Sequence, residues 1–193
     1  MKDYFFSYLY RMRYIQRWGL MKNSAAENLA EHTLDTAVIA HALAVIGNRI
    51  FGKKHSPERC AAAALFHDAP EILTGDLPTP VKYFNPEIRE AYKKVEKNAA
   101  EKLLGYLPEE LYPEYHSLFE AVKGDGDVAN VVHWADKLSA YIKCMEEMKS
   151  GNHEFKTASE SIRKGLEETN SEEVAYFLEH FIPGFALTLD ELD

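Results

Sequence analysis

Apolar residues recur at every third or fourth position along almost the whole chain, and this periodicity strongly constrains the fold. Alternating, strand-like runs that end in Asn-Gly or Asp-Gly turns are nearly absent. A chain with this pattern buries apolar helical stripes rather than sheet faces, so we predict an all-α fold. The length of 193 residues predicts one domain that covers 1–193.

Helix-start signals divide the chain into segments. Asn28 opens a capping-box pattern, and Ser56, Asn85 and Ser171 each precede a proline or acidic residues that favour a first helical turn. The stretch 74–81 contains two prolines and a glycine, so we predict a stiff loop there. The predicted helices lie near 4–16, 29–50, 57–69, 86–105, 109–123, 127–150, 153–169 and 172–181.

The charge balance argues against some classes of function. Twenty-two Lys and Arg against 31 Asp and Glu give a net charge of −9, which repels nucleic acids and anionic membranes, so we expect no nucleic-acid polymer as a partner. The longest stretch without a formal charge, 36–48, is shorter than the roughly 18 apolar residues of a membrane span, so we expect no membrane segment. Two distant cysteines, Cys60 and Cys144, and an N-terminal segment interrupted by charges indicate a cytoplasmic protein.

Three acidic or imidazole side chains occur where an apolar environment would require a partner for them. His67-Asp68 follows a small, apolar helix, and Pro70 disfavours helical geometry just before it, so both side chains can turn toward one point. Asp136 lies in an otherwise apolar stretch of its predicted helix, where a carboxylate needs either a salt bridge, for example with Lys143, or a bound cation.

His32 falls in the first turn of the helix predicted over 29–50, where a helix end can direct it toward a site. Taken singly, each of these residues has a plainer interpretation, as a capping or surface histidine or as a solvated or salt-bridged aspartate. Together, His32, His67, Asp68 and Asp136 supply two imidazoles and two carboxylates. Such a set suits Mn, Fe, Co or Zn and leaves coordination positions open for water and substrate.

The order of these residues, a His, a His-Asp pair and a distant Asp, resembles the signature of the HD-domain phosphohydrolases. Over nearly the whole chain the sequence is similar to the bacterial 5′-deoxynucleotidases of this superfamily, in Arg17-Trp18, Glu31-His32, His67 to Glu71, Thr74 to Lys82, Ala135 to Tyr141 and Phe181 to Phe185. The resemblance implies a single-domain, HD-type helical bundle with a mononuclear metal site. It also implies a homodimer that hydrolyses deoxyribonucleoside 5′-monophosphates to deoxynucleosides and phosphate.

The same resemblance assigns roles to residues. One divalent metal ion, Co, Mn, Zn or similar, would be held by His32, His67, Asp68 and Asp136. Glu71 would act as general acid or base, although from the residues alone it is equally well a first-turn carboxylate that the helix dipole favours.

The substrate, a small deoxynucleotide, would be bound by residues in and near the predicted loop. Arg17 would orient the phosphate for catalysis, since its guanidinium suits a phosphate monoester, and Trp18 would pack against the sugar where a 2′-hydroxyl would clash. The implied substrate contacts are Arg17, Trp18, Asp68, Asp76, Leu77, Pro78, Thr79 and Asp136.

Other interpretations stay open. HD-type guanosine polyphosphate (alarmone) hydrolases have a second acid after the glutamate of their motif, where this chain has Ile72. A non-catalytic HD binding module would show degenerate ligands, and none of the four is missing. A second metal would need further histidines before the last aspartate, where only His116 and His133 occur.

Overall fold

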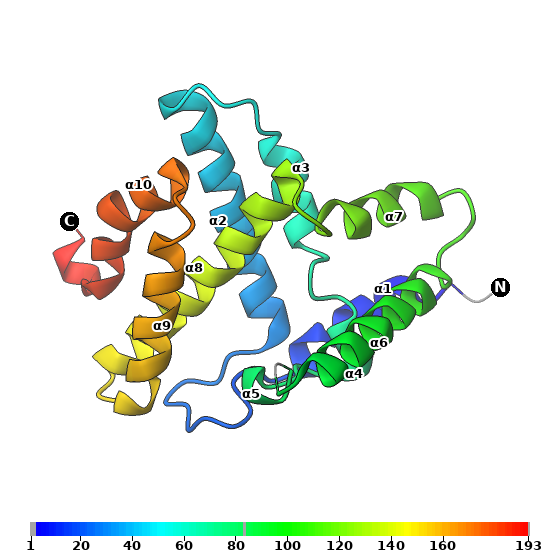
Figure 1. Ribbon diagram of the computed structural model, residues 1–193, viewed down its shortest axis with the longest axis horizontal. Helices are drawn as coiled ribbons and strands as arrows, with labels where there is room; N and C mark the ends of the chain where they lie inside the picture. Colours follow the sequence, from blue (N-terminus) through cyan, green and yellow to red (C-terminus); the bar gives the residue numbers. More distant parts are fainter. Residues whose placement is uncertain (1–2, 83, 193) are drawn as a thin grey trace.

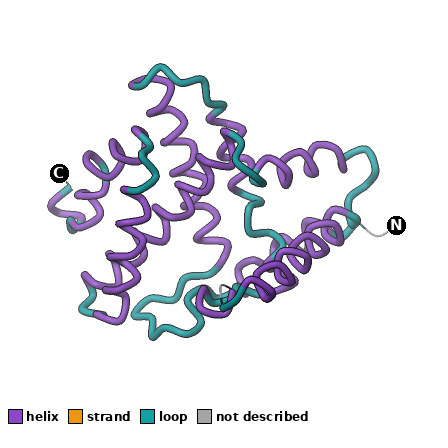
Figure 2. Tube along the Cα trace, viewed as in Figure 1, coloured by secondary structure: helices purple, strands orange, loops and turns teal. Residues whose placement is uncertain are grey.

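The computed structural model describes residues 3–82 and 84–192, which form helices joined by loops (Figure 1). Within these residues the structure contains no β-strand, as Figure 2 shows, and its isolated β-bridge joins Gln16 to Asn28. The prediction of an all-α fold is therefore confirmed.

The helices have the following bounds. They are α1 (Phe5–Leu9), α2 (Leu29–Ile50), α3 (Pro57–Ala64), α4 (Glu71–Thr74), α5 (Thr79–Lys82), α6 (Pro86–Leu104), α7 (Tyr112–Ala121), α8 (Asp127–Lys149), α9 (Lys156–Glu167) and α10 (Glu172–His180). Short 3-10 helices are η1 (Tyr10–Tyr14), η2 (His153–Phe155), η3 (Ile182–Ala186) and η4 (Leu189–Glu191).

The caps and breaks differ from prediction at three places. Asn28 forms the predicted capping box with Glu31, but the Ser56 side chain makes no capping hydrogen bond. The prediction of a stiff loop over 74–81 was wrong at its C-terminal end, because Thr79–Lys82 forms one helical turn. The helix predicted over 57–69 ends at Ala64, since the backbone beyond it continues in turns rather than in an α-helix.

The centre of the molecule is formed by α2, which packs against α3 and α8 (Figure 1). By length and composition alone α2 could cross a membrane, but 56% of its most apolar window is buried inside the protein, as in the core helix of a soluble protein. We call the buried residues around α2 the central cluster: Ala37, Ile39, Ala40, Leu43, Ala44, Ile46, Cys60, Ala63, Ala64, Val131, Val132, Ala135, Leu138, Leu166, Val174, Phe177, Leu178 and Ile182.

A second group of buried apolar residues belongs mainly to α1, α6 and α7. This flanking cluster consists of Phe5, Ala69, Ala100, Leu103, Leu104, Leu107 and Phe119. In Figure 1, α1, α4 and α6 lie together on the opposite side of the molecule from α9 and α10. The molecule therefore has two apolar clusters, each centred on its own helices.

The segment 65–70 runs from one cluster to the other. Ala64 belongs to the central cluster and Ala69 to the flanking cluster, so His67 and Asp68 lie between the two. Pro70 disfavours helical geometry at the residue before it, and the amide of His67 bonds to the Ala64 carbonyl three residues earlier. The break in the helix is what turns this His-Asp pair away from either cluster.

An ion-pair network centred on the shielded side chain of His55 closes the far end of α2. The His55 ring lies against Gly47, with Nδ1 at 2.7 Å from Asp127 and Nε2 at 3.1 Å from Glu173. A Cβ at position 47 would lie 2.5 Å from Cδ2 of this ring, and two carboxylates prevent the ring from moving away. Glycine is therefore required at this point of an otherwise continuous helix.

We expect Gly47→Ala to lower the free energy of unfolding by about 1–3 kcal/mol, because the added methyl overpacks the His55 site. The matched control is Gly165→Ala in α9, where the nearest atom to a new Cβ lies at 3.9 Å. This control should stabilise the protein by about 0.5–1 kcal/mol through backbone entropy. Urea denaturation of both variants tests the difference, and a Gly47→Ala variant as stable as the control would contradict the close packing.

Candidate active site

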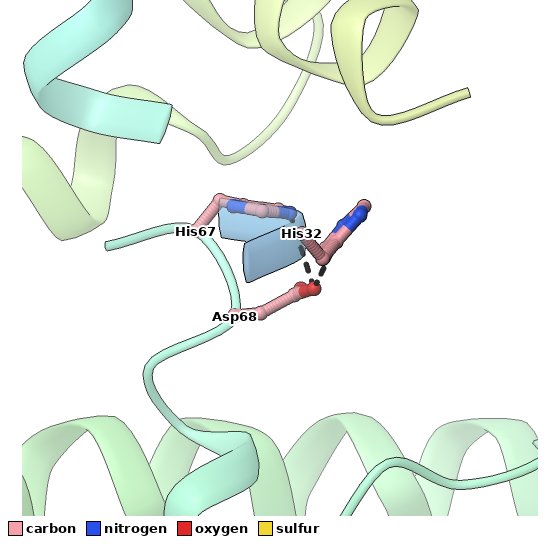
Figure 3. Close-up of side chains that lie close together, drawn as sticks. All are labelled: His32, His67 and Asp68. Carbon is pink, nitrogen blue, oxygen red and sulfur yellow. Dashed lines mark ion pairs between the residues drawn. The ribbon is translucent and has the colours of Figure 1, made fainter. Parts of the chain in front are cut away.

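Two histidines and an aspartate bring their donor atoms to one point. One donor atom from each of His32, His67 and Asp68 lies within 4.8 Å of the other two (Figure 3). His67 Nε2 is 3.1 Å from Asp68 Oδ2, and His32 Nε2 is 3.6 Å from the same oxygen. The side chains come from α2 and from segment 65–70, which are held together by the packing of α2 against α3.

Asp136 approaches this group from α8. Its Oδ1 is 3.1 Å from His32 Nε2, although it is not part of the compact group of three. Lys143, the salt-bridge partner considered for Asp136, instead bonds to Glu147 at 2.5 Å. The structure thus brings all four predicted ligands together, with Asp136 joined through His32.

The arrangement of donors fits a divalent metal ion. Bonds of about 2.0–2.2 Å place neighbouring ligand atoms about 3.0–3.6 Å apart, and three pairs of these donor atoms, His32–Asp68, His32–Asp136 and His67–Asp68, lie in that range. Apart from its ion-pair contact with Asp68, the buried Nε2 of His67 makes no hydrogen bond among the described residues, while its Nδ1 donates to the Ala64 carbonyl at 2.7 Å. His32 Nδ1 lies 3.1 Å from Ser139 Oγ. Both rings are therefore oriented through Nδ1 and present Nε2 to the site.

The electrostatics of the site favour a cation. Burial opposes ionisation of Asp136, but its hydrogen bond with His32 and the charges of His67 and Arg17 hold its pKa below the usual range. Burial likewise opposes a charge on His67, yet the neighbouring Asp68 raises the pKa of His67 to about 9. The carboxylates of the site thus strongly favour positive charge beside them.

Glu71 begins α4 and is only 6% exposed. Burial, together with the negative charges of Asp68 and Asp76, raises the pKa of Glu71 to about 9. Its Oε2 is buried without a hydrogen-bond partner among the described residues. Glu71 lines a cavity of about 560 Å³ that also reaches His67 and Asp68. A buried carboxyl with an unused oxygen is suited to proton transfer at this point.

A second cavity, of about 650 Å³, reaches the metal-ligand group at Asp136. Seven of the eight predicted substrate contacts line it, all except Asp68: Arg17, Trp18, Asp76, Leu77, Pro78, Thr79 and Asp136. Its wall is completed from α8 and α9 by Lys137, Ala140, Ala158, Ser161 and Ile162, which the sequence did not single out. The lining of this cavity is therefore partly apolar and partly charged, and one of its charged residues is the predicted metal ligand Asp136.

Glu27 is a further residue of the site that sequence reasoning missed. Its Oε2 accepts hydrogen bonds from Arg17 Nε at 3.1 Å and from Trp18 Nε1 at 2.7 Å. Arg17 NH1 in turn lies 3.6 Å from Asp68 Oδ2. No local pattern reveals this contact, because Glu27 precedes a helix cap and is separated from Arg17 by nine intervening residues.

The two additional histidines considered for a second metal lie outside the ligand group. His133 is exposed on α8, and the half-exposed His116 is 3.9 Å from Glu120 on its own helix. Neither belongs to the compact group found among the described residues. Among the described residues, the compact group of possible metal ligands is therefore the one formed by His32, His67 and Asp68.

Comparison with known proteins relates the chain to a family. Residues 4–185 match the family described as "5′-deoxynucleotidase YfbR-like". A 5′-deoxynucleotidase from Vibrio cholerae is 50% identical over 191 residues, with 99% of this chain and 98% of the relative covered. A 5′-deoxynucleotidase from Photorhabdus laumondii is 47% identical, with 98% and 96% covered.

Solved structures with this fold include HD-domain phosphohydrolases. The protein from Listeria innocua superposes with a TM-score of 0.83 at 24% identity and covers 94% of this chain and 87% of its own. An HD phosphohydrolase from cyanophage S-2L, solved with dA and one catalytic Zn²⁺, has a TM-score of 0.63 at 20% identity, with 92% and 96% covered. The prediction of an HD-type helical fold is confirmed.

We expect Ser139→Ala to weaken metal binding about 10–100-fold, because it removes the hydroxyl that orients His32 through Nδ1. The measurement is calorimetric titration of metal-stripped protein with Mn²⁺ or Zn²⁺. The control is Ser159→Ala, which alters a buried serine of α9 outside the ligand group. Equal affinities in both variants would show that Ser139 does not orient a ligand.

Proposed function

We propose that two histidines and two aspartates hold one divalent metal ion in this chain, which belongs to the YfbR-like 5′-deoxynucleotidase family and hydrolyses deoxyribonucleoside 5′-monophosphates. The convergence of His32, His67 and Asp68 is the observation that carries the proposal. Asp136 completes the set from α8. The donors, two nitrogens and two oxygens, accept Co, Mn or Zn.

A divalent ion held there lowers the pKa of water and offsets negative charge on a phosphoryl oxygen. Hydrolysis joins the oxygen of water to phosphorus and breaks the bond between phosphorus and the 5′-oxygen. The 5′-oxygen then needs a proton. Each group that supplies or removes a proton in this sequence must come from the protein or from solvent.

Glu71 is the proposed general acid or base. A carboxyl with a pKa raised by burial carries a proton near neutral pH and can deliver it to the leaving 5′-oxygen. When the attacking water loses its proton, the same carboxylate can accept it. The unpartnered Oε2 supports this role, because it is free to bond to a reacting group.

Arg17 and Trp18 are proposed to bind two adjoining parts of the substrate, its phosphate and its sugar. The Arg17 guanidinium, close to Asp68, orients the phosphate, and the Trp18 indole packs against the deoxyribose. The segment from Asp76 to Thr79 lines the same cavity, and prolines limit its freedom, so it loses little entropy on binding. We propose that Asp76, which lines this cavity, holds the sugar hydroxyl.

We also infer a cytoplasmic homodimer of single-domain chains, 1–193, without a nucleic-acid polymer or a membrane as partner. The net charge of −9 supports the absence of polymer binding. Both cysteines, Cys60 and Cys144, are buried as free thiols, which supports a reducing compartment. The homodimer rests on family resemblance, and sedimentation of the purified protein tests it.

The proposed division of roles predicts two different defects. Asp68→Ala should lose both metal affinity and phosphate release, because it removes a ligand. Glu71→Gln should retain metal affinity and lose about 10²–10⁴-fold in kcat, because only proton transfer is removed. The assay measures phosphate release from deoxy and ribo 5′-monophosphates and a guanosine polyphosphate, with Mn, Co, Zn or Mg restored to stripped protein.

Each other outcome of this assay has a meaning. Turnover of the polyphosphate alone would move the assignment to the alarmone hydrolases. Tight metal binding without turnover of any substrate would indicate a non-catalytic module. Full activity of Glu71→Gln would exclude Glu71 as the acid or base.

Trp18→Ala should raise activity on ribonucleotides relative to deoxyribonucleotides, because the indole that would clash with a 2′-hydroxyl is removed. We expect the ratio of kcat/KM on the deoxyribonucleotide to kcat/KM on the ribonucleotide to fall by about tenfold. Parallel assays on dAMP and AMP provide the measurement. An unchanged ratio would remove Trp18 from sugar selection.

A further inference from the structure

Glu27 connects the two residues proposed to hold the phosphate and the sugar of the substrate. A single oxygen, Oε2, accepts the hydrogen bonds of both Arg17 Nε and Trp18 Nε1. The side chains of Arg17 and Glu27 are only 12% and 10% exposed, and Trp18 is partly buried. Hydrogen bonds to a buried carboxylate are strong, so this oxygen sets the distance between guanidinium and indole.

The backbone reinforces the same connection. The amide of Arg17 donates to the Glu27 carbonyl at 3.0 Å, beside the bridge between Gln16 and Asn28. Trp18 has a φ of 59°, a left-handed conformation that is costly for a residue with a large side chain. Such a conformation persists only when the surroundings fix it. The Trp18 indole donates a hydrogen bond to Glu27 and packs against the Phe155 ring, with 5.2 Å between the ring centroids.

The charge of Glu27 does not assist binding of the substrate directly. A phosphate monoester dianion is repelled by every carboxylate nearby, and Arg17 already has Asp68, Asp136 and Asp76 as negative neighbours. A fourth acidic group close to Arg17 weakens the attraction for phosphate. Its presence is explained by geometry, since it occupies Arg17 Nε and leaves the NH1 and NH2 ends of the fork for other partners.

We propose that Glu27 is a positioning residue that sets deoxyribose selectivity by locking the Trp18 indole at a fixed distance from the phosphate-binding end of Arg17. The proposal rests on the proposed function of the site. When Arg17 holds the phosphate and Trp18 packs against the sugar, a 2′-hydroxyl would clash with the Trp18 indole, because Glu27 prevents the ring from moving. Without Glu27 the ring is free to move aside, and the ribose is accommodated.

The test compares Glu27→Ala and Glu27→Gln with the unchanged protein on dAMP and AMP. Glu27→Ala should lower the ratio of deoxy to ribo kcat/KM by about tenfold, approaching the ratio of Trp18→Ala. Glu27→Gln keeps a carbonyl acceptor in place and should restore most of the selectivity. Because a ratio does not depend on the amount of folded enzyme, a variant that is only less stable leaves it unchanged.

A double variant separates positioning from a general effect. If Glu27 acts through Trp18, adding Glu27→Ala to Trp18→Ala should not change the ratio further. The matched control is Glu154→Gln, which removes another carboxylate bonded to the same loop, at the Lys22 amide, without contact to Arg17 or Trp18 in the described hydrogen bonds. The control should keep the selectivity of the unchanged protein.

A readout independent of activity uses the indole itself. In a Trp134→Phe background Trp18 is the sole tryptophan, and Glu27→Ala should increase quenching of its fluorescence by acrylamide. An unmoved ratio together with unmoved quenching would overturn the proposal. Absence of nucleotide hydrolysis by the unchanged protein would instead refute the proposed function, and the quenching measurement would still test whether Glu27 holds Trp18.

Discussion

The candidate active site depends on a convergence that its own charges oppose. Asp68 and Asp136 approach a common point, where like charges repel, and two buried imidazoles lie between them. Apolar packing keeps them there, because α2 is fixed against α3 and α8 by the central cluster. Such a preformed group of donors needs little reorganisation to accept a cation, so hydrophobic burial sets the geometry on which the chemistry relies.

The sequence predicted the parts of the site that follow from local patterns. Asn28 caps α2 as expected and so places His32 in a first turn. Pro70 correctly indicated a break near His67, but the break came earlier than predicted, because turns replace the helix from position 65. The short helix Thr79–Lys82 was missed, because Pro78 and Pro80 indicate a loop. Proline is tolerated in the first turn of a helix, which is where Pro80 lies.

Contacts between distant segments could not be predicted from one sequence. Glu27 reads as an ordinary polar residue before a helix cap, and only the folded chain shows that it bonds to Arg17 and Trp18. Lys143 differs, because its partner Glu147 lies four residues further along α8, a local spacing that the sequence does contain. Side-chain partners across a loop are decided by tertiary packing, for which periodicity carries no signal.

The path of segment 65–70 between two clusters has a consequence for how such an enzyme changes over generations. Asp136 and His32 are carried by helices of the central cluster, whereas α4 with Glu71 packs on α6, at the flanking cluster. Substitutions among the apolar residues of the flanking cluster, such as Leu103, shift the proton-transfer group relative to His32 and Asp136 and leave these two ligands in place. Mutation and selection can therefore adjust the position of Glu71 without repacking the helices that carry these two ligands.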